Sequence, residues 1–224
     1  MRYLRRLAIR KLKYVVIGAI GVGAASMFRG GLPEIPPLDR NQSKSSASVL
    51  EHGSYSALYN REDWRHWIDD DGDCQDARAE TLIAASITPV QFNNPSRSCT
   101  VRSGRWADPY SGQILSDARG IDIDHVVPLA WASGHGGGQW SKSMKARFAN
   151  DPDNLLAVLA KENRAKGAKS PDEWLPSNTG YRCDYIRHFD AVVVKYGLAY
   201  APSEQAFINQ ALQLCSGARP IAKL

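Results

Sequence analysis

The chain has 224 residues, of which 43% are hydrophobic and 23% charged, which excludes a disordered or fibrous protein and suits one globular domain with a buried core. Its net charge of +5 would by itself favour a polyanionic partner. However, seven of the 28 basic residues and none of the 23 acidic ones lie in residues 1–29. The rest of the chain is slightly acidic, so any affinity for nucleic acid must come from a local basic patch.

The N-terminus has the pattern of an export signal. A basic stretch, residues 2–13, precedes the apolar run Tyr14–Phe28, which is shorter than the roughly 20 residues that span a bilayer. We therefore expect a signal peptide or an N-terminal membrane segment over 1–28, with membrane contact there. The protein would then be secreted, periplasmic or anchored at the cell surface. The alternative is a cytosolic amphipathic arm. Residues 29–58, rich in Gly, Pro and Ser, predict a flexible linker, and 59–217 the main domain.

Four cysteines lie in the main domain: Cys74, Cys99, Cys183 and Cys215. An even number after an export signal favours two disulfides, although four cysteines allow three pairings. Proximity in sequence favours Cys74–Cys99 and Cys183–Cys215. Buried free thiols are the alternative. No C-x-x-C pair occurs, which argues against a cysteine zinc site.

The remaining patterns predict short elements of both kinds. In the first half we expect a helix capped by Asn60, an acidic turn at 69–73 that caps a helix over 74–86, a hairpin over 98–106 that turns at Ser103–Gly104, and a turn at 109–112. Next we expect a strand within 120–130, a helix between 139 and 150, a strand over 153–160 and a helical turn over 161–167. The last elements are a short helix capped by Ser170 and helices over 181–196 and 203–215. The tryptophans and other aromatic residues are expected to form the core. His135, in a glycine-rich loop, is assigned no role.

Two segments combine residue types that suit chemistry on a phosphate. The first, D-I-D-H-V-V-P over 122–128, places acids inside a β-rich run, where they need a cation or hydrogen bonds. Strict alternation would put Asp124 and His125 on opposite faces, so they share a site only if the strand ends there, which Pro128 makes feasible. The second runs from Asp153-Asn154 to E-N-R-A-K-G over 162–167. In it Asn163 and Lys166 face the same way on a helical turn.

Together these segments provide the groups for phosphodiester hydrolysis. A neutral histidine accepts a proton from water near neutral pH. Oxygen ligands hold a divalent cation that stabilises charge on the phosphoryl group. Basic side chains position the flanking phosphates. Lys142, Lys145, Arg147, Lys161, Arg164 and Lys169 are available for such a patch, although each alone is an ordinary surface charge.

The ordered set D-I-D-H-V-V-P, D-N-L-L and E-N-R-A-K-G resembles the HNH, or His-Me finger, nuclease motif. With Y-N-R-E-D-W, D-P-Y-S-G and W-L-P, the chain from Tyr59 to Cys215 is similar to the secreted bacterial HNH endonucleases. The resemblance implies that His125 is the general base and that Asn154 is the central asparagine bracing its loop. It implies Asp124 and Asn163 as metal ligands, and Lys166 with Arg164 at the substrate phosphate.

The implied fold is α+β, a ββα-metal core embedded in flanking helices and stapled by disulfides. The implied activity is Mg²⁺-dependent cleavage of DNA, or also RNA, with low sequence specificity; Mn²⁺ or another divalent cation is an alternative. Asn163 stands where other members have histidine, which leaves metal preference open. Arg61, Asp76 and Arg78 match the family context and are expected to form a buried ion-pair network. Rival interpretations are a toxin nuclease with an immunity or inhibitor protein, and a non-catalytic cell-surface binding module.

Overall fold

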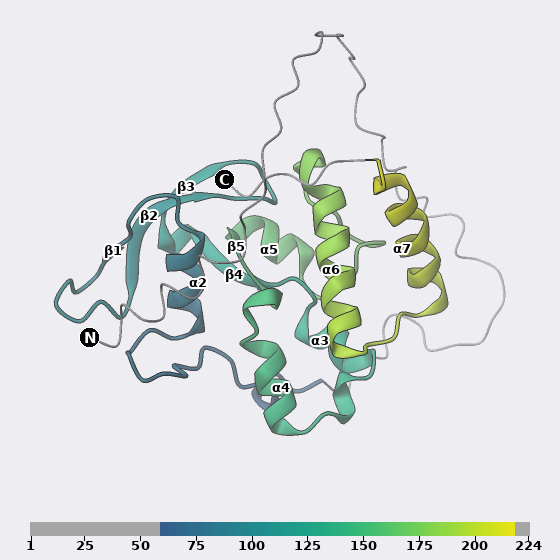
Figure 1. Ribbon diagram of the computed structural model, residues 1–224, viewed down its shortest axis with the longest axis horizontal. Helices are drawn as coiled ribbons and strands as arrows, with labels where there is room; N and C mark the ends of the chain where they lie inside the picture. Colours follow the sequence, from purple (N-terminus) through teal and green to yellow (C-terminus); the bar gives the residue numbers. More distant parts are fainter. Residues whose placement is uncertain (1–58, 218–224) are drawn as a thin grey trace, which may run out of the picture. The chain divides into compact units, whose positions relative to one another are not determined.

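The computed structural model describes residues 59–217, so the expected signal or membrane segment and the linker, 1–58, lie outside the described residues, as do 218–224 (Figure 1). The fold mixes α and β, as predicted. Its helices are α2 (Ala77–Ala85), α3 (Leu129–Gly134), α4 (Lys142–Ala149), α5 (Ala160–Lys166), α6 (Arg182–Tyr196) and α7 (Pro202–Cys215). Its strands are β1 (Gln91–Phe92), β2 (Val101–Ala107), β3 (Ile114–Asp117), β4 (Ile121–His125) and β5 (Leu155–Leu159). Among residues 59–217, no helix combines the length and apolar character needed to cross a bilayer.

The two sheets are both antiparallel. One has the order β1-β2-β3, and the other consists of β4 and β5, paired from Ile121 with Leu159 to His125 with Leu155. Helix α5 follows β5 directly and packs against both strands (Figure 1). The predicted strand within 120–130, the strand over 153–160 and the helical turn after it are therefore confirmed. Gly167 ends α5 with φ of 57°, a left-handed value that a residue with a side chain adopts at a cost.

The β4–β5 pair is buried on both faces. An aromatic core cluster lies between it and α3, α4, α6 and α7, and includes Phe148, Val158 and Tyr185. A second core cluster, beneath α2 and β2, includes Trp106 and Ile123. Because successive side chains of a strand point to opposite faces, each face of the pair supplies one cluster. Burial of both faces explains the nearly continuous apolar run of β5. It also places the end of β4 in the interior.

Both predicted disulfides are confirmed. Cys74–Cys99 links residues 25 apart, with Cα atoms 5.1 Å apart, and Cys183–Cys215 links residues 32 apart, with Cα atoms 5.5 Å apart. The second joins α6 to α7, which lie side by side (Figure 1). Closing loops of this length stabilises the fold by about 3–4 kcal/mol for each bridge in the chain-entropy account. The alternative of free thiols is wrong.

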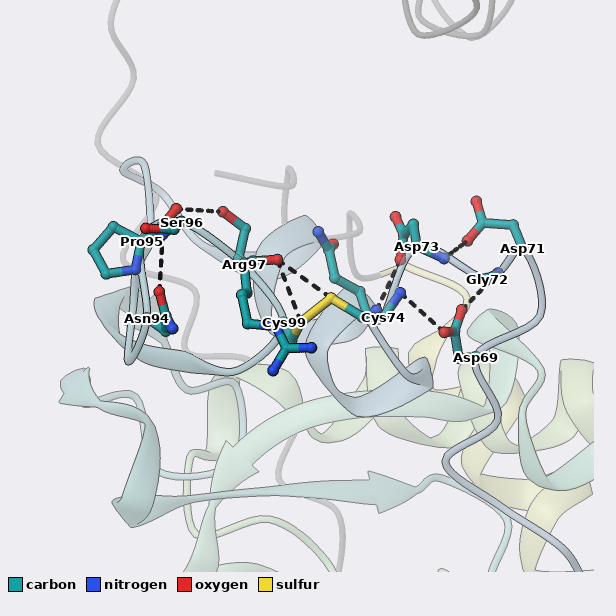
Figure 2. The surroundings of a disulfide bond; sticks show 12 residues. Asp69, Asp71, Gly72, Asp73, Cys74, Asn94, Pro95, Ser96, Arg97 and Cys99 are labelled. Carbon is teal, nitrogen blue, oxygen red and sulfur yellow. Dashed lines mark hydrogen bonds between the residues drawn. A yellow bond between two sulfur atoms is a disulfide. The ribbon is translucent and has the colours of Figure 1, made fainter.

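Figure 2 shows the first disulfide beside the acidic turn. The Asp69 carboxylate accepts hydrogen bonds from the backbone N–H groups of Gly72 and Cys74, and Asp73 accepts one from Gln75. These acids therefore cap their own loop. The prediction that they cap the following helix is wrong, because Asp76 is the N-cap of α2 and accepts from the N–H of Ala79.

Two other local predictions are wrong, and the prediction of Asn60 as an N-cap is confirmed only for a short turn. Ser103–Gly104 is no hairpin turn, because β2 continues through it and pairs with β3 across the turn at 109–112, which was predicted correctly. A Cβ on Gly104 would lie 2.8 Å from the Trp106 ring, so glycine leaves room for that buried side chain. Asn60 caps only the 3₁₀ turn Arg61–Asp63, and Ser170 begins a turn instead of a helix.

His135 also departs from expectation, because it is buried and contributes to the core. Its Nδ1 lies 2.6 Å from the carbonyl oxygen of Trp131 and its Nε2 lies 2.9 Å from Oε2 of Glu204. Glu204 also accepts from the Trp131 indole and from the Ser170 hydroxyl. These contacts tie α3 to α7. The glycine-rich loop concealed this role, because the partner lies 69 residues further along the chain.

The two disulfides should differ in their resistance to reductants. Cys74 is exposed, whereas Cys215 is 0% exposed. Thiol–disulfide exchange needs access to sulfur, so a mild dithiol should open Cys74–Cys99 at least about ten-fold faster than Cys183–Cys215 in the folded protein. Timed alkylation followed by peptide mass spectrometry measures both rates. In denaturant the difference should disappear, and equal rates in the folded protein would contradict the prediction.

Candidate functional site

A pocket of about 340 Å³ lies where β4 ends and α5 packs against it. It is lined by Asp124 and His125 from β4, by Asn163 and Arg164 from α5, and by Arg61 from the start of the described chain, among others. Four of the residues that the sequence predicted for a site therefore share one pocket, although they come from segments about 40 residues apart.

His125 is held in one orientation and one tautomer. It is 7% exposed, and its Nε2 lies 2.9 Å from the carbonyl oxygen of Ala149. A carbonyl oxygen only accepts, so Nε2 carries the hydrogen and Nδ1 keeps its lone pair. Burial lowers the pKa of His125 to about 3; the bond to Ala149 opposes this shift, and nearby positive groups reinforce it. The imidazole is therefore neutral at pH 7 and able to accept a proton.

Asn154 holds the chain just beyond His125. It is fully buried, and its backbone carbonyl accepts from Val126 N–H. Its side-chain Oδ1 accepts from Val127 N–H at 2.8 Å, while its Nδ2 donates to the Val127 carbonyl at 3.3 Å. These bonds end the strand at His125. Because the strand ends there, Asp124 and His125 both line the pocket despite the alternation of side chains.

Asp124 belongs to a buried ion pair. Lys166 Nζ lies 2.9 Å from Asp124 Oδ1 and 2.9 Å from the His125 carbonyl, and Tyr110 Oη lies 2.6 Å from Asp124 Oδ2. Burial raises the pKa of Asp124 and lowers that of Lys166, and the contact between the two opposes both shifts. A buried carboxylate needs such partners, because desolvation of an unpaired charge is costly.

Lys166 therefore lies differently from its predicted place at a substrate phosphate. Its side chain is 0% exposed and is directed at Asp124. It shares a helix face with Asn163, as the spacing predicted, but that face packs onto β4. The Lys166 ammonium group contacts the Asp124 carboxylate and the His125 carbonyl at the end of β4. If it moved to a phosphate in the pocket, Asp124 would be buried without its cation.

Asn163 and Arg164 lie at the opening of the site. Asn163 Nδ2 donates to Asp122 Oδ2 at 3.2 Å, which leaves its amide oxygen as the atom it can offer to a cation. The Arg164 side chain is 77% exposed, and its Nε lies 3.9 Å from Asp122 Oδ2. Asp122 is only partly buried and contacts both residues, so it orients them from beside the pocket.

Sequence reasoning missed two aromatic contributors. Tyr110, in the D-P-Y-S-G segment, is fully buried and donates to Asp124. Trp67 stacks on His125, with ring centroids 5.9 Å apart and an interplanar angle of 26°. Its φ of 58° is strained for a bulky residue, and such strain clusters at functional sites. Both were assigned to the core by their type; only the tertiary contacts reveal their place.

The predicted ion-pair network of Arg61, Asp76 and Arg78 is wrong. Asp76 caps α2, and Arg78 donates to the backbone carbonyls of Ala118 and Ile121. Arg61 lies at the pocket instead.

Comparison with known proteins matches residues 76–208 to the family described as GmrSD restriction endonucleases, C-terminal domain. A relative from Arthroderma benhamiae, named "Uncharacterized secreted protein", is 35% identical over 185 residues, covering 82% of this chain and 88% of its own. No solved structure matches the chain. The relative is fungal, so similarity of this kind is not confined to bacterial proteins.

The Asp124–Lys166 pair yields a prediction about stability. Lys166→Met keeps the length of the side chain but leaves the carboxylate buried without its cation, so we expect a loss of about 3–5 kcal/mol at pH 7. Urea unfolding measures it. Lys161→Met, on the exposed side of the same helix, should change stability by less than about 0.5 kcal/mol. Equal losses in the two variants would contradict the structural role given to the pair.

Proposed function

The chain belongs to the family of the GmrSD restriction endonuclease C-terminal domain, and on this premise we propose that it is a metal-dependent HNH-type endonuclease that hydrolyses phosphodiester bonds of DNA. RNA is an alternative substrate. The observation that supports this most is a neutral, oriented His125 in one pocket with Asp124 and Asn163. In this proposal β4, β5 and α5 are the ββα-metal unit.

The proposed reaction uses His125 as general base. Its Nδ1 takes a proton from water while Nε2–H stays bonded to the Ala149 carbonyl, which prevents the ring from turning away. The water oxygen forms a bond to phosphorus and the bond to the 3′ oxygen breaks, leaving a 5′-phosphate. The departing oxygen is protonated by solvent. The imidazolium formed in this step returns its proton to solvent before the next turnover, and the lowered pKa of His125 favours that return.

The residues fit a hard divalent cation. Asp124 has about four lone-pair positions on its two oxygens, of which Lys166 and Tyr110 use two. Asn163 offers an amide oxygen, and all four cysteines are in disulfides. Oxygen ligands without thiolate suit Mg²⁺, or Mn²⁺ as the alternative. When bound, the cation supplies neutralisation of charge on the phosphoryl and leaving oxygens.

The other residues have supporting roles in this proposal. Asn154 braces the loop after His125, and Lys166 with Tyr110 orients Asp124. Arg164 is exposed at the pocket, so its guanidinium is available to a phosphate of the substrate backbone. The disulfides, together with a relative that is named a secreted protein, support a place outside the reducing cytosol.

Removal of His125 should abolish the activity selectively. We expect His125→Ala to lower the rate of plasmid cleavage by about 10²–10⁴-fold, because general-base catalysis is lost while the oxygen ligands remain. His188→Ala is the matched control, since that ring lies outside the pocket and contacts the Asp153 carbonyl. Supercoiled plasmid conversion, followed on gels, gives both rates. Near wild-type cleavage by His125→Ala would refute the assignment.

Removal of the cation should be reversible, unlike the loss of His125. Wild-type cleavage should stop in excess chelator and return with Mg²⁺. Asn163→Ala should need a higher Mg²⁺ concentration, because an oxygen ligand is lost, whereas His125→Ala should keep the wild-type metal affinity. Isothermal titration calorimetry of Mg²⁺ against the three proteins tests this. Full activity in chelator would remove the metal from the mechanism.

A further inference from the structure

The segment at the start of the described chain, 59–68, forms part of the pocket although it precedes the ββα elements. Arg61, in the 3₁₀ turn Arg61–Asp63, lines the same pocket as Asp124, His125 and Asn163. The family match begins only at residue 76, so this contribution lies outside the matched part of the chain.

A hydrogen bond links the Arg61 side chain to His66. His66 Nδ1 lies 2.8 Å from the Trp64 carbonyl oxygen, which only accepts, so Nδ1 carries the hydrogen. His66 Nε2 then presents a lone pair, to which Arg61 Nη2 donates at 3.4 Å. Trp64 is 1% exposed and belongs to the aromatic core cluster. The guanidinium is therefore linked through His66 to the rigid interior.

The segment itself is anchored to α4. Asn150, at the end of that helix, accepts from Ile68 N–H with Oδ1 at 3.0 Å and donates from Nδ2 to the Arg65 carbonyl at 2.8 Å. Between these two anchors Trp67 adopts its left-handed φ and stacks on His125. The same short stretch thus supports the proposed base and presents Arg61 to the pocket.

In the part of the chain that the structure describes, Arg61 pairs with no carboxylate. Within residues 59–217 its guanidinium contacts the His66 ring and the Tyr59 hydroxyl, neither of which is a carboxylate. Arg119 and Arg187, by contrast, each bond a carboxylate. An arginine held in a pocket with donors to spare is suited to an anion with several oxygens, and phosphate matches the fork of its N–H groups.

We propose that Arg61 binds the phosphodiester group under attack, and that His66 positions it. The proposal rests on the proposed nuclease function, and it adds a substrate-binding residue from outside the ββα unit. The guanidinium neutralises charge that grows on the phosphoryl oxygens as water attacks. Arg164 approaches the same pocket from α5, so the two arginines flank the bound backbone.

Single-turnover cleavage of a short labelled duplex in Mg²⁺ tests the proposal. Arg61→Gln should lower the rate by about 10- to 100-fold, the effect of losing one charge-assisted contact, and Arg61→Lys should recover part of it. Arg65→Gln is the matched control: it removes the same charge from the same segment, but Arg65 does not line the pocket, and its rate should stay within about two-fold. Arg61 and Arg65 are both exposed, so thermal unfolding should show that both variants fold.

A double-variant cycle tests the role of His66. His66→Ala should slow cleavage less than Arg61→Gln does, and the double variant should be no slower than Arg61→Gln alone, because His66 acts through Arg61. Additive losses would overturn the positioning role. Equal rates for Arg61→Gln and Arg65→Gln would overturn the phosphate contact.

Binding of the same duplex in excess chelator, followed by fluorescence anisotropy, separates this proposal from the proposed function. If the wild type binds but never cuts, and only Arg61→Gln weakens binding, the phosphate site stands while the hydrolysis fails. If the wild type cuts and the two arginine variants behave alike, the hydrolysis stands and the Arg61 contact is wrong. If the wild type neither binds nor cuts, both are wrong.

Discussion

The buried contact between Asp124 and Lys166 connects the two parts of the pocket, and the geometry of the site depends on it. The ammonium bridges the Asp124 carboxylate and the His125 carbonyl, so the last turn of α5 is tied to the last residues of β4. Neither charge is tolerable in this interior alone. The requirement that both be paired therefore fixes where α5 lies, and with it where Asn163 meets the pocket.

Around that pair, two further constraints orient His125. Asn154 stops β4 at the histidine by occupying the backbone groups beyond it, and Ala149 takes the Nε2 hydrogen. Trp67 covers the ring face. Because Nε2 of His125 donates to the Ala149 carbonyl, Nδ1 is the ring nitrogen that can accept a proton. These contacts fix the orientation of the ring, and burial lowers its pKa so that it is neutral at pH 7.

The distribution of charge along the chain explains why the net charge says little about the pocket. The basic residues near the N-terminus dominate the net charge, whereas the pocket uses few, individually placed cations. Lys166 is buried and paired with Asp124, whereas Arg61 and Arg164 line the pocket. In the proposed function, these individually placed cations are the groups that contact the substrate phosphates.

The sequence alone predicted the order of strand, strand and helix, because periodicity is a local signal. Proximity along the chain favoured the two disulfide pairings that the structure shows. The D-I-D-H and E-N-R-A-K-G segments indicated four residues that line the pocket, namely Asp124, His125, Asn163 and Arg164. Tertiary structure decided where Lys166, Tyr110, Trp67 and Arg61 lie and what they contact. Whether a lysine faces solvent or a buried carboxylate, and whether a tryptophan packs in a core or on a histidine, depends on neighbours that lie 40 or more residues away in the chain. The continuity of β2 through Gly104 is also decided by packing, since the burial of Trp106 against Gly104 overrides the turn preference of Ser-Gly.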